Sequence, residues 1–106
     1  MKYQLGISPA AAADIDDAAL YIAARNLSAG LRFYDAVDVT VREIAQHPRR
    51  WPLFETNVTQ LQDLRRRSVK GFPNYLVFYR YDERLVLIVR VIHGARDLPK
   101  ILRGET

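Results

Sequence analysis

The chain contains no cysteine, and it has only one methionine and one tryptophan among its 106 residues. Without cysteine it can form neither a disulfide bond nor a thiolate zinc site, and it has no thiol nucleophile. Long hydrophobic runs are missing as well. The strongly hydrophobic run 85–89 is broken by Arg90, whereas a membrane helix needs about 20 apolar residues. Residues 1–5 also lack the apolar segment of a secretory signal, so we expect a soluble, cytoplasmic chain without a membrane span.

The composition predicts one folded domain over residues 1–106. Hydrophobic residues make up 49% of the chain and charged residues 26%, with five glycines and five prolines. These proportions are typical of a globular domain, and the length suffices for a hydrophobic core without disulfide bonds or a metal. No repeat, low-complexity tract or flexible linker divides the chain.

The positive charge is concentrated in the second half of the chain. Residues 1–48 carry four basic and six acidic side chains, whereas residues 49–106 carry twelve basic and six acidic ones, for net charges of −2 and +6. Thirteen of the sixteen basic residues are arginine, which makes planar, two-point contacts with carboxylates and phosphates. We therefore expect an anionic partner, either nucleic acid or an acidic protein segment, and a merely solubilising basic surface is the alternative.

The first half of the chain predicts a strand followed by two helices. Residues 2–7 alternate apolar and polar side chains, which is typical of a strand. Ser8 and the following proline form a helix-start signal, and a helix is predicted over about residues 9–25. Ser28 is the expected cap of a second helix, which ends at His47-Pro48. Because the connection is short, the two helices should form an antiparallel hairpin.

The second half predicts a loop, three strands and a short helix. Residues 49–62 read as a loop that Trp51 and Phe54 attach to the body of the domain. The expected strands are residues 64–69, 75–81 and 85–92, separated by short connectors at 71–74 and 82–84, and residues 98–102 form a final helix capped by Asp97. The predicted fold is α+β in the order β-α-α-β-β-β, with the hairpin on one face of an antiparallel sheet and the other face partly open.

The candidate functional residues lie on the three predicted strands and just after them. They are Arg65, Arg66, Arg67, Arg80, Arg90, His93 and Arg96. Alternation along a strand places Arg65 and Arg67 on one face and Arg66 on the other. Such a basic face would bind either an RNA backbone or an acidic peptide. The alternative is an edge strand that its charges protect from aggregation.

Arg90 and His93 have both structural and chemical interpretations. Arg90 interrupts an apolar strand, which indicates a half-buried ion pair with Asp14 or Asp97. His93 is the only plausible general acid or base in the basic half, but a histidine beside a glycine at a strand end is more often a hydrogen-bonded turn residue. His47 and His93 form no recognisable metal site, and the sequence has no phosphate-binding glycine loop. We therefore expect no metal and no cofactor.

Over nearly its full length the sequence resembles the ParE branch of the ParE/RelE superfamily of bacterial toxin–antitoxin toxins. The resemblance begins with Ser8-Pro9 and continues through the pairs 14–15 and 21–22 on the first helix to His47-Pro48. The most specific blocks are residues 69–80 (VKGFPNYLVFYR) and 90–98 (RVIHGARDL). The superfamily's fold, a helical hairpin on an antiparallel sheet, agrees with the order predicted above.

The resemblance implies a growth-arresting toxin, of the kind involved in plasmid stabilisation, that a ParD-like antitoxin neutralises in a hetero-oligomer by wrapping it with a partly disordered tail. ParE-type relatives inhibit DNA gyrase, whereas RelE-type relatives cut mRNA on the ribosome with basic strand residues and a tyrosine or histidine near the C-terminus. The segment after Arg96 contains neither residue type. This departure favours a protein that acts by binding, with gyrase as target.

Two alternatives stay open, and they concern the same surface. Arg65, Arg67 and His93 would be the catalytic residues if the chain were a ribosome-dependent mRNA endonuclease. A relative that has lost toxicity and only binds its antitoxin is the second alternative. The expected antitoxin- or target-binding residues are Arg65, Arg67, Arg80, Arg90, His93 and Arg96, and the residues leave direct nucleic-acid binding open.

Overall fold

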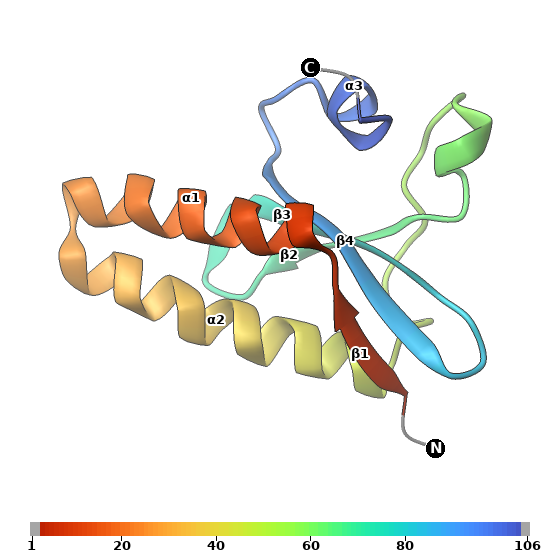
Figure 1. The fold of residues 1–106 in the computed structure, drawn as a ribbon, viewed down its shortest axis with the longest axis horizontal. Coiled ribbons are helices and arrows are strands. Elements are labelled where there is room, and N and C mark those ends of the chain that lie inside the picture. The colour runs from red at the N-terminus through yellow and green to blue at the C-terminus, as the bar shows by residue number, and fades with distance from the viewer. Residues whose placement is uncertain (1–2, 105–106) are drawn as a thin grey trace.

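A helical hairpin packs on one face of a four-stranded sheet (Figure 1). The computed structural model describes residues 3–104. In chain order the elements are β1 (Gln4–Ile7), α1 (Pro9–Arg25), α2 (Leu27–Gln46), the 3-10 helix η1 (Thr59–Leu61), β2 (Arg65–Val69), β3 (Phe72–Tyr81), β4 (Leu85–His93) and α3 (Leu98–Leu102). The predicted α+β class and element order are confirmed. The predicted first strand also included Lys2, which lies outside the described residues.

The start of α1 is confirmed, whereas the predicted start of α2 is wrong. The Ser8 hydroxyl accepts a hydrogen bond from the Ala11 N–H at 3.0 Å, and Pro9 occupies the first turn. Asn26, and not Ser28, caps α2: its side-chain oxygen accepts from the Ala29 N–H at 3.0 Å, while its own N–H donates to a carbonyl of α1. A single extended residue therefore ends one helix and begins the next, and Ser28 lies inside the first turn of α2.

The two helices approach each other closely at Gly30, which is buried in α2. A Cβ atom at this position would lie 2.5 Å from the Cβ of Ala23 and 2.9 Å from the carbonyl oxygen of Ala19. Only glycine leaves room for the backbone of α1 at this distance. The antiparallel hairpin predicted from the sequence is confirmed (Figure 1), and its tight contact depends on small residues in both helices.

The strand order is β1-β4-β3-β2, and the sheet is mixed. The strands β2, β3 and β4 form the predicted antiparallel meander. The expectation of an antiparallel sheet is wrong for β1, which pairs with β4 in parallel, Gln4 opposite Leu85 and Ile7 opposite Ile88. Short connectors fix the relative directions of the last three strands. The long connection from β1 to β4 has no such constraint, because the hairpin and two strands intervene.

The turn between β2 and β3 is shorter than predicted. Residues 71–74 were expected to connect the strands, but β3 already begins at Phe72, and Lys70 and Gly71 form the turn. Gly71 has a φ of +82°, a conformation that favours glycine. The register shifts between Ser68 and Val69, so Pro73, which has no N–H, is tolerated beside an irregular part of the ladder.

The main core lies between the hairpin and the sheet. Its fully buried members come from α1, α2 and all three meander strands, and include Ala11, Phe33, Ile44, Val69, Val77, Tyr79 and Ile88. The hydroxyl of Tyr79 donates to the Pro48 carbonyl at 2.6 Å, and burial raises the pKa of Tyr79 to about 12. This bond fixes the start of the segment that follows α2.

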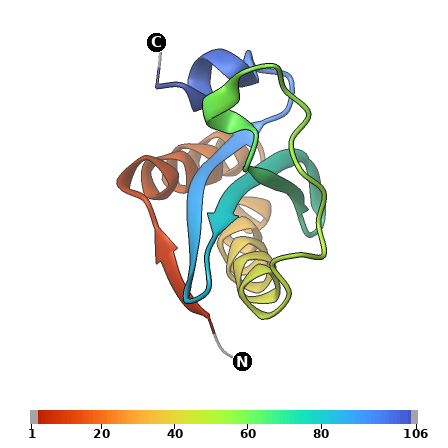
Figure 2. The ribbon, with the colours of Figure 1, turned by 90° about the vertical axis from the view of Figure 1, so that its right-hand side faces the viewer.

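The second face of the sheet was expected to be partly open, and in the structure the segment 49–64 and α3 cover part of it. Phe54 contacts Phe78 edge to face at a centroid distance of 5.3 Å, and Trp51 packs against the main core. Both rings therefore anchor the segment as predicted. In Figure 2, η1 and α3 lie at the end of the molecule opposite the N-terminus. Among the residues that the structure describes, no helix is long and apolar enough to cross a membrane.

Candidate functional site

A cleft of about 400 Å³ lies between α1 and the ends of β3 and β4. It contains two of the predicted residues, His93 and Arg96. The full lining is Asp14, Asp17, Ala18, Tyr21, Tyr75, Val91, Ile92, His93 and Arg96. An apolar floor with charged and aromatic side chains around it is the usual composition of a ligand or peptide site.

Tyr75 and His93 form the aromatic wall of this cleft. Their rings meet edge to face at 5.2 Å, and Tyr75 also contacts the buried ring of Phe33 at 5.2 Å. Burial, and then the proximity of Tyr21, raises the pKa of Tyr75. The Nδ1 atom of His93 accepts a hydrogen bond from the Ala95 N–H at 3.1 Å, which leaves the proton of the neutral ring on Nε2. His93 is therefore a hydrogen-bonded turn residue that also faces the cleft.

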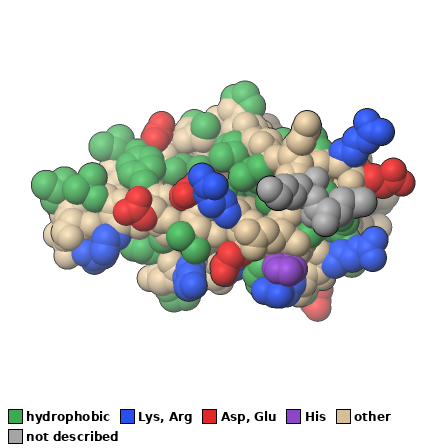
Figure 3. Space-filling view, turned by 90° about the horizontal axis from the view of Figure 1, so that it is seen from below, with side chains coloured by type: hydrophobic (Ala, Val, Ile, Leu, Met, Phe, Trp, Pro, Cys, Tyr) green, Lys and Arg blue, Asp and Glu red, His purple; other side chains and the backbone are tan. Residues whose placement is uncertain are grey.

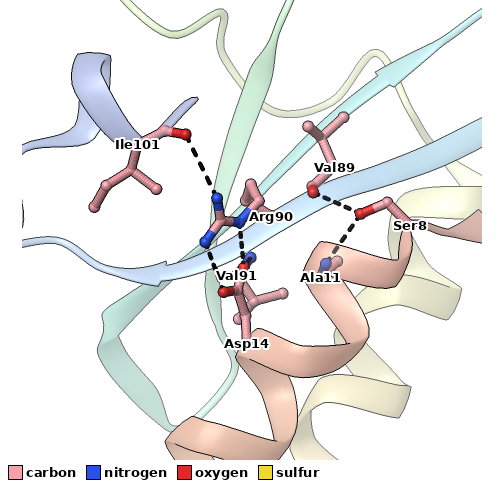
Figure 4. A network of polar contacts seen from close by, with 7 residues as sticks. All are labelled: Ser8, Ala11, Asp14, Val89, Arg90, Val91 and Ile101. Atoms are coloured by element: carbon pink, nitrogen blue, oxygen red, sulfur yellow. Dashed lines mark hydrogen bonds and ion pairs between the residues drawn. The ribbon is translucent and has the colours of Figure 1, made fainter. Parts of the chain in front are cut away.

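Arg90 forms a two-point ion pair with Asp14 of α1 (Figure 4). Its Nε lies 2.6 Å from Asp14 Oδ2 and its Nη2 lies 2.8 Å from Oδ1. The Val91 N–H donates to the same carboxylate at 3.0 Å, and Arg90 Nη1 donates to the Ile101 carbonyl at 3.4 Å. The hydrogen bond to Asp14 raises the pKa of Arg90 above its usual value, against the effect of burial. The predicted ion pair of Arg90 is confirmed, with Asp14 as the partner out of the two candidates, and Asp97 caps α3 as expected.

The Asp14 carboxylate also binds the backbone of β4 beyond the point where its pairing with β1 ends. Beyond the end of β1, the Ser8 hydroxyl donates to the Val89 carbonyl at 2.8 Å, and Asp14 then accepts from Val91 (Figure 4). Side chains from the start of α1 thus satisfy the backbone groups of β4 that β1 is too short to reach. One carboxylate thereby connects α1, β4 and, through Arg90, the final helix α3.

Arg65 and Arg67 lie together at the other edge of the sheet, as alternation predicted. Arg67 Nη2 lies 2.6 Å from Glu43 Oε1 of α2, and its guanidinium carbon lies 4.2 Å from the centre of the Trp51 ring. Arg65 Nη1 donates to the Trp51 carbonyl at 2.7 Å. Both guanidinium groups therefore hold the segment after α2 in place. Arg66, on the opposite side of β2, is exposed.

The Arg67–Glu43 pair predicts a pH-dependent contribution to stability. The hydrogen bond from Arg67 lowers the pKa of Glu43 from its ordinary value of 4.5. A lowered pKa in the folded state contributes stability above the unfolded-state pKa, and this contribution disappears as the pH falls through the folded-state value. We expect the difference in free energy of unfolding between the natural chain and Glu43→Gln to be largest near pH 7 and to vanish well below pH 4.5. Urea unfolding at pH 7 and pH 3 measures it, and a difference that is unchanged at pH 3 would contradict the prediction.

Arg80 lies on the second face of the sheet, away from both other sites. Its Nη2 atom is 3.1 Å from Asp63 Oδ1 and 3.3 Å from the Gln60 carbonyl oxygen. The six predicted binding residues therefore occupy separate places: Arg65 and Arg67 beside Trp51, Arg80 on the second face, and Arg90, His93 and Arg96 at or beside the cleft. Their role in binding stays a prediction.

The three residues of the nuclease alternative do not share a pocket in this structure. Arg67 is in register with Val77 of β3, and Val77 is in register with Val91 of β4. The Arg67 guanidinium contacts α2, whereas His93 lines the cleft beside α1. The sequence reasoning missed Tyr75 and Tyr21 as cleft residues. The spacing of positions 14, 18 and 21 on one helix face was the signal for the α1 side of the cleft.

Together, the fold and the site define a small α+β domain in which a helical hairpin and the ends of two strands enclose an aromatic cleft. Residues 5–98 match the family described as "ParE toxin of type II toxin-antitoxin system, parDE". The chain therefore belongs to the ParE toxin family.

The fold is also similar to a solved structure titled "Chromosomal ParDE TA system from P. aeruginosa". The similarity has a TM-score of 0.71 at 15% sequence identity and covers 87% of this chain and 96% of that chain. At this identity the likeness supports the fold. Among individually curated proteins, no sequence match is found.

Proposed function

We propose that this ParE toxin arrests growth by inhibiting DNA gyrase and that a cognate, ParD-like antitoxin in the same cytoplasm neutralises it in a hetero-oligomer. The observation that carries the proposal is the family match over residues 5–98. The separation of Arg65 and Arg67 from His93 supports a toxin that acts by binding, because in-line RNA cleavage needs its acid, base and cation around one phosphate.

The surface of the toxin has the features that an antitoxin segment with acidic and apolar residues would need. Exposed hydrophobic side chains gather toward the hairpin end (Figure 3), among them Leu27 and Leu31, which are 69% and 62% exposed. Tyr21 continues this apolar surface on α1 toward the cleft, where Arg96 is exposed. Exposed apolar groups beside cations suit a disordered segment that folds as it binds.

A supercoiling assay with purified components tests the gyrase proposal. We expect the free toxin to block ATP-dependent supercoiling of relaxed plasmid by gyrase, or to trap cleaved DNA, when it is in molar excess over the enzyme. The toxin–antitoxin complex is the matched control and should leave supercoiling intact. Full supercoiling in the presence of excess folded toxin would overturn the proposal.

The mRNA endonuclease is the second candidate, and the basic strand β2 is the observation that favours it. It predicts codon-linked cleavage of mRNA in a translation reaction, and the cleavage should disappear in His93→Ala. Intact transcripts in the presence of folded toxin would exclude this activity. A chain that neither cuts mRNA nor affects gyrase, and whose expression alone allows growth, would be an inactive antitoxin-binding relative.

A further inference from the structure

A second cavity, of about 370 Å³, lies on the sheet face opposite the hairpin. It lies between the η1 segment and α3 and is open to solvent, with Arg80 of β3 and Val89 of β4 at its base. The full lining is Gln60, Leu61, Leu64, Arg80, Val89, Leu102 and Arg103. Four of these seven side chains are apolar, and two are cationic.

The guanidinium of Arg80 is only partly used by the protein. Its Nη2 atom contacts Asp63 and the Gln60 carbonyl, and these are its hydrogen bonds within residues 3–104. In this part of the chain Nε is buried and has no hydrogen-bond partner. A buried donor without a partner is unfavourable, because it has lost its hydrogen bond to water, and native structures contain few such groups. The Nε donor of Arg80 therefore lacks an acceptor among the described residues.

The ion pair with Asp63 does not remove this deficit. The side chains of Arg80 and Asp63 are 38% and 64% exposed, and an exposed pair of this kind contributes little to stability. An incoming anion can therefore compete for the guanidinium without losing a strong internal contact. A carboxylate matches the planar, two-point geometry that arginine offers, and the neighbouring Nε and Nη2 groups of Arg80 form the edge of the guanidinium that would receive it in place of Asp63.

The apolar lining restricts which anions fit. Leu61 and Leu64 are buried, and Leu102 lines the cavity on the side of α3. A fully hydrated phosphate gains nothing from such walls, whereas a branched hydrocarbon group beside a carboxylate loses water against them. We propose that this cavity is a binding site for a carboxylate carried on a short apolar group, with Arg80 as the carboxylate-binding residue. The proposal depends neither on gyrase inhibition nor on the antitoxin.

Proton–nitrogen NMR of the arginine side chains tests this site on the intact chain. The probe is isovalerate, and the matched ligands are acetate, isoamyl alcohol and inorganic phosphate at equal ionic strength. We expect a saturable shift of the Arg80 Nε–H signal with isovalerate, a weaker response to acetate and none to the alcohol. Arg84, exposed in the turn before β4, is the internal control, and its signal should not move.

Two variants separate binding from a change in folding. Arg80→Lys keeps the charge but loses the two-point contact and the Nε–H signal, so its binding is followed on the backbone amide signals of the lining residues Leu64 and Val89. Isovalerate binding should weaken about tenfold. Arg84→Lys should leave binding unchanged, and thermal unfolding should show that both variants are folded. An equal shift at Arg84, tighter binding of phosphate than of isovalerate, or no saturable shift at Arg80 would each overturn the proposal.

Discussion

Asp14→Ala is expected to lower the free energy of unfolding by about 3 kcal/mol, because it removes one partner of a largely buried ion pair. The Arg90 and Asp14 side chains are only 22% and 12% exposed. Without the carboxylate, Arg90 loses two charge-assisted hydrogen bonds and the Val91 N–H loses its acceptor. In a domain of this size the loss corresponds to a decrease in Tm of about 15 °C.

Differential scanning calorimetry of three chains checks this prediction. Asp17→Ala is the matched control, because Asp17 lies one turn further along α1 and is exposed, so its Tm should stay close to that of the natural chain. Asp14→Asn keeps the shape of the side chain, so its Tm should lie between those of Asp14→Ala and Asp17→Ala. If Asp14→Ala unfolds at the same temperature as Asp17→Ala, the ion pair does not hold α1 to β4.

Phe33→Ala is expected to have the largest effect on stability, with a loss of about 3–5 kcal/mol. Phe33 is fully buried in α2, and its ring meets Phe72 at 5.1 Å and Tyr75 at 5.2 Å. Truncation would leave a cavity at the centre of the main core and remove the support of the Tyr75 ring in the cleft. The free energy of unfolding of a natural domain is only about 5–15 kcal/mol in total. A large part of the stability therefore depends on this side chain.

Urea unfolding followed by circular dichroism measures the effect of this change. Phe33→Leu is the control, because leucine fills much of the same volume and should cost clearly less than alanine. The near-ultraviolet signal of the aromatic residues should weaken in both variants. An alanine variant as stable as the leucine variant would mean that the core can collapse around the missing ring.

Local signals in the sequence were sufficient for most of the fold. The Ser8-Pro9 pair and the helical spacing identified α1 to within its observed bounds, and short connectors identified the antiparallel meander. The errors concern the start of α2, for which two residues could act as the cap, and the direction of β1. Asn26 and Ser28 are both good caps, and the extended backbone of Asn26 decides between them. The direction of β1 depends on packing between distant segments, which no local pattern records.

The site was predictable only in part, for a related reason. That Arg90 pairs with a carboxylate followed from a charge in an apolar strand, because burying an unpaired guanidinium is too costly. The choice of Asp14 over Asp97 did not follow from the sequence. Alternation also grouped Arg65 with Arg67 correctly. Charge alone, however, could not show that these two arginines bind Trp51 and Glu43. The sequence also could not predict that Tyr21 of α1 and Tyr75 of β3 line the same cleft, because this depends on the tertiary packing.

The position of β4 has a consequence for how this toxin is made. It is the last strand in the chain, yet it lies inside the sheet, between β1 and β3. The first strand, β1, therefore has no partner until residues 85–88 have been synthesised. Contacts between such distant segments form slowly, since a long loop must close first. During translation the emerging N-terminal part exposes the apolar face of its hairpin, so the folded toxin arises only once nearly all of the described chain has left the ribosome.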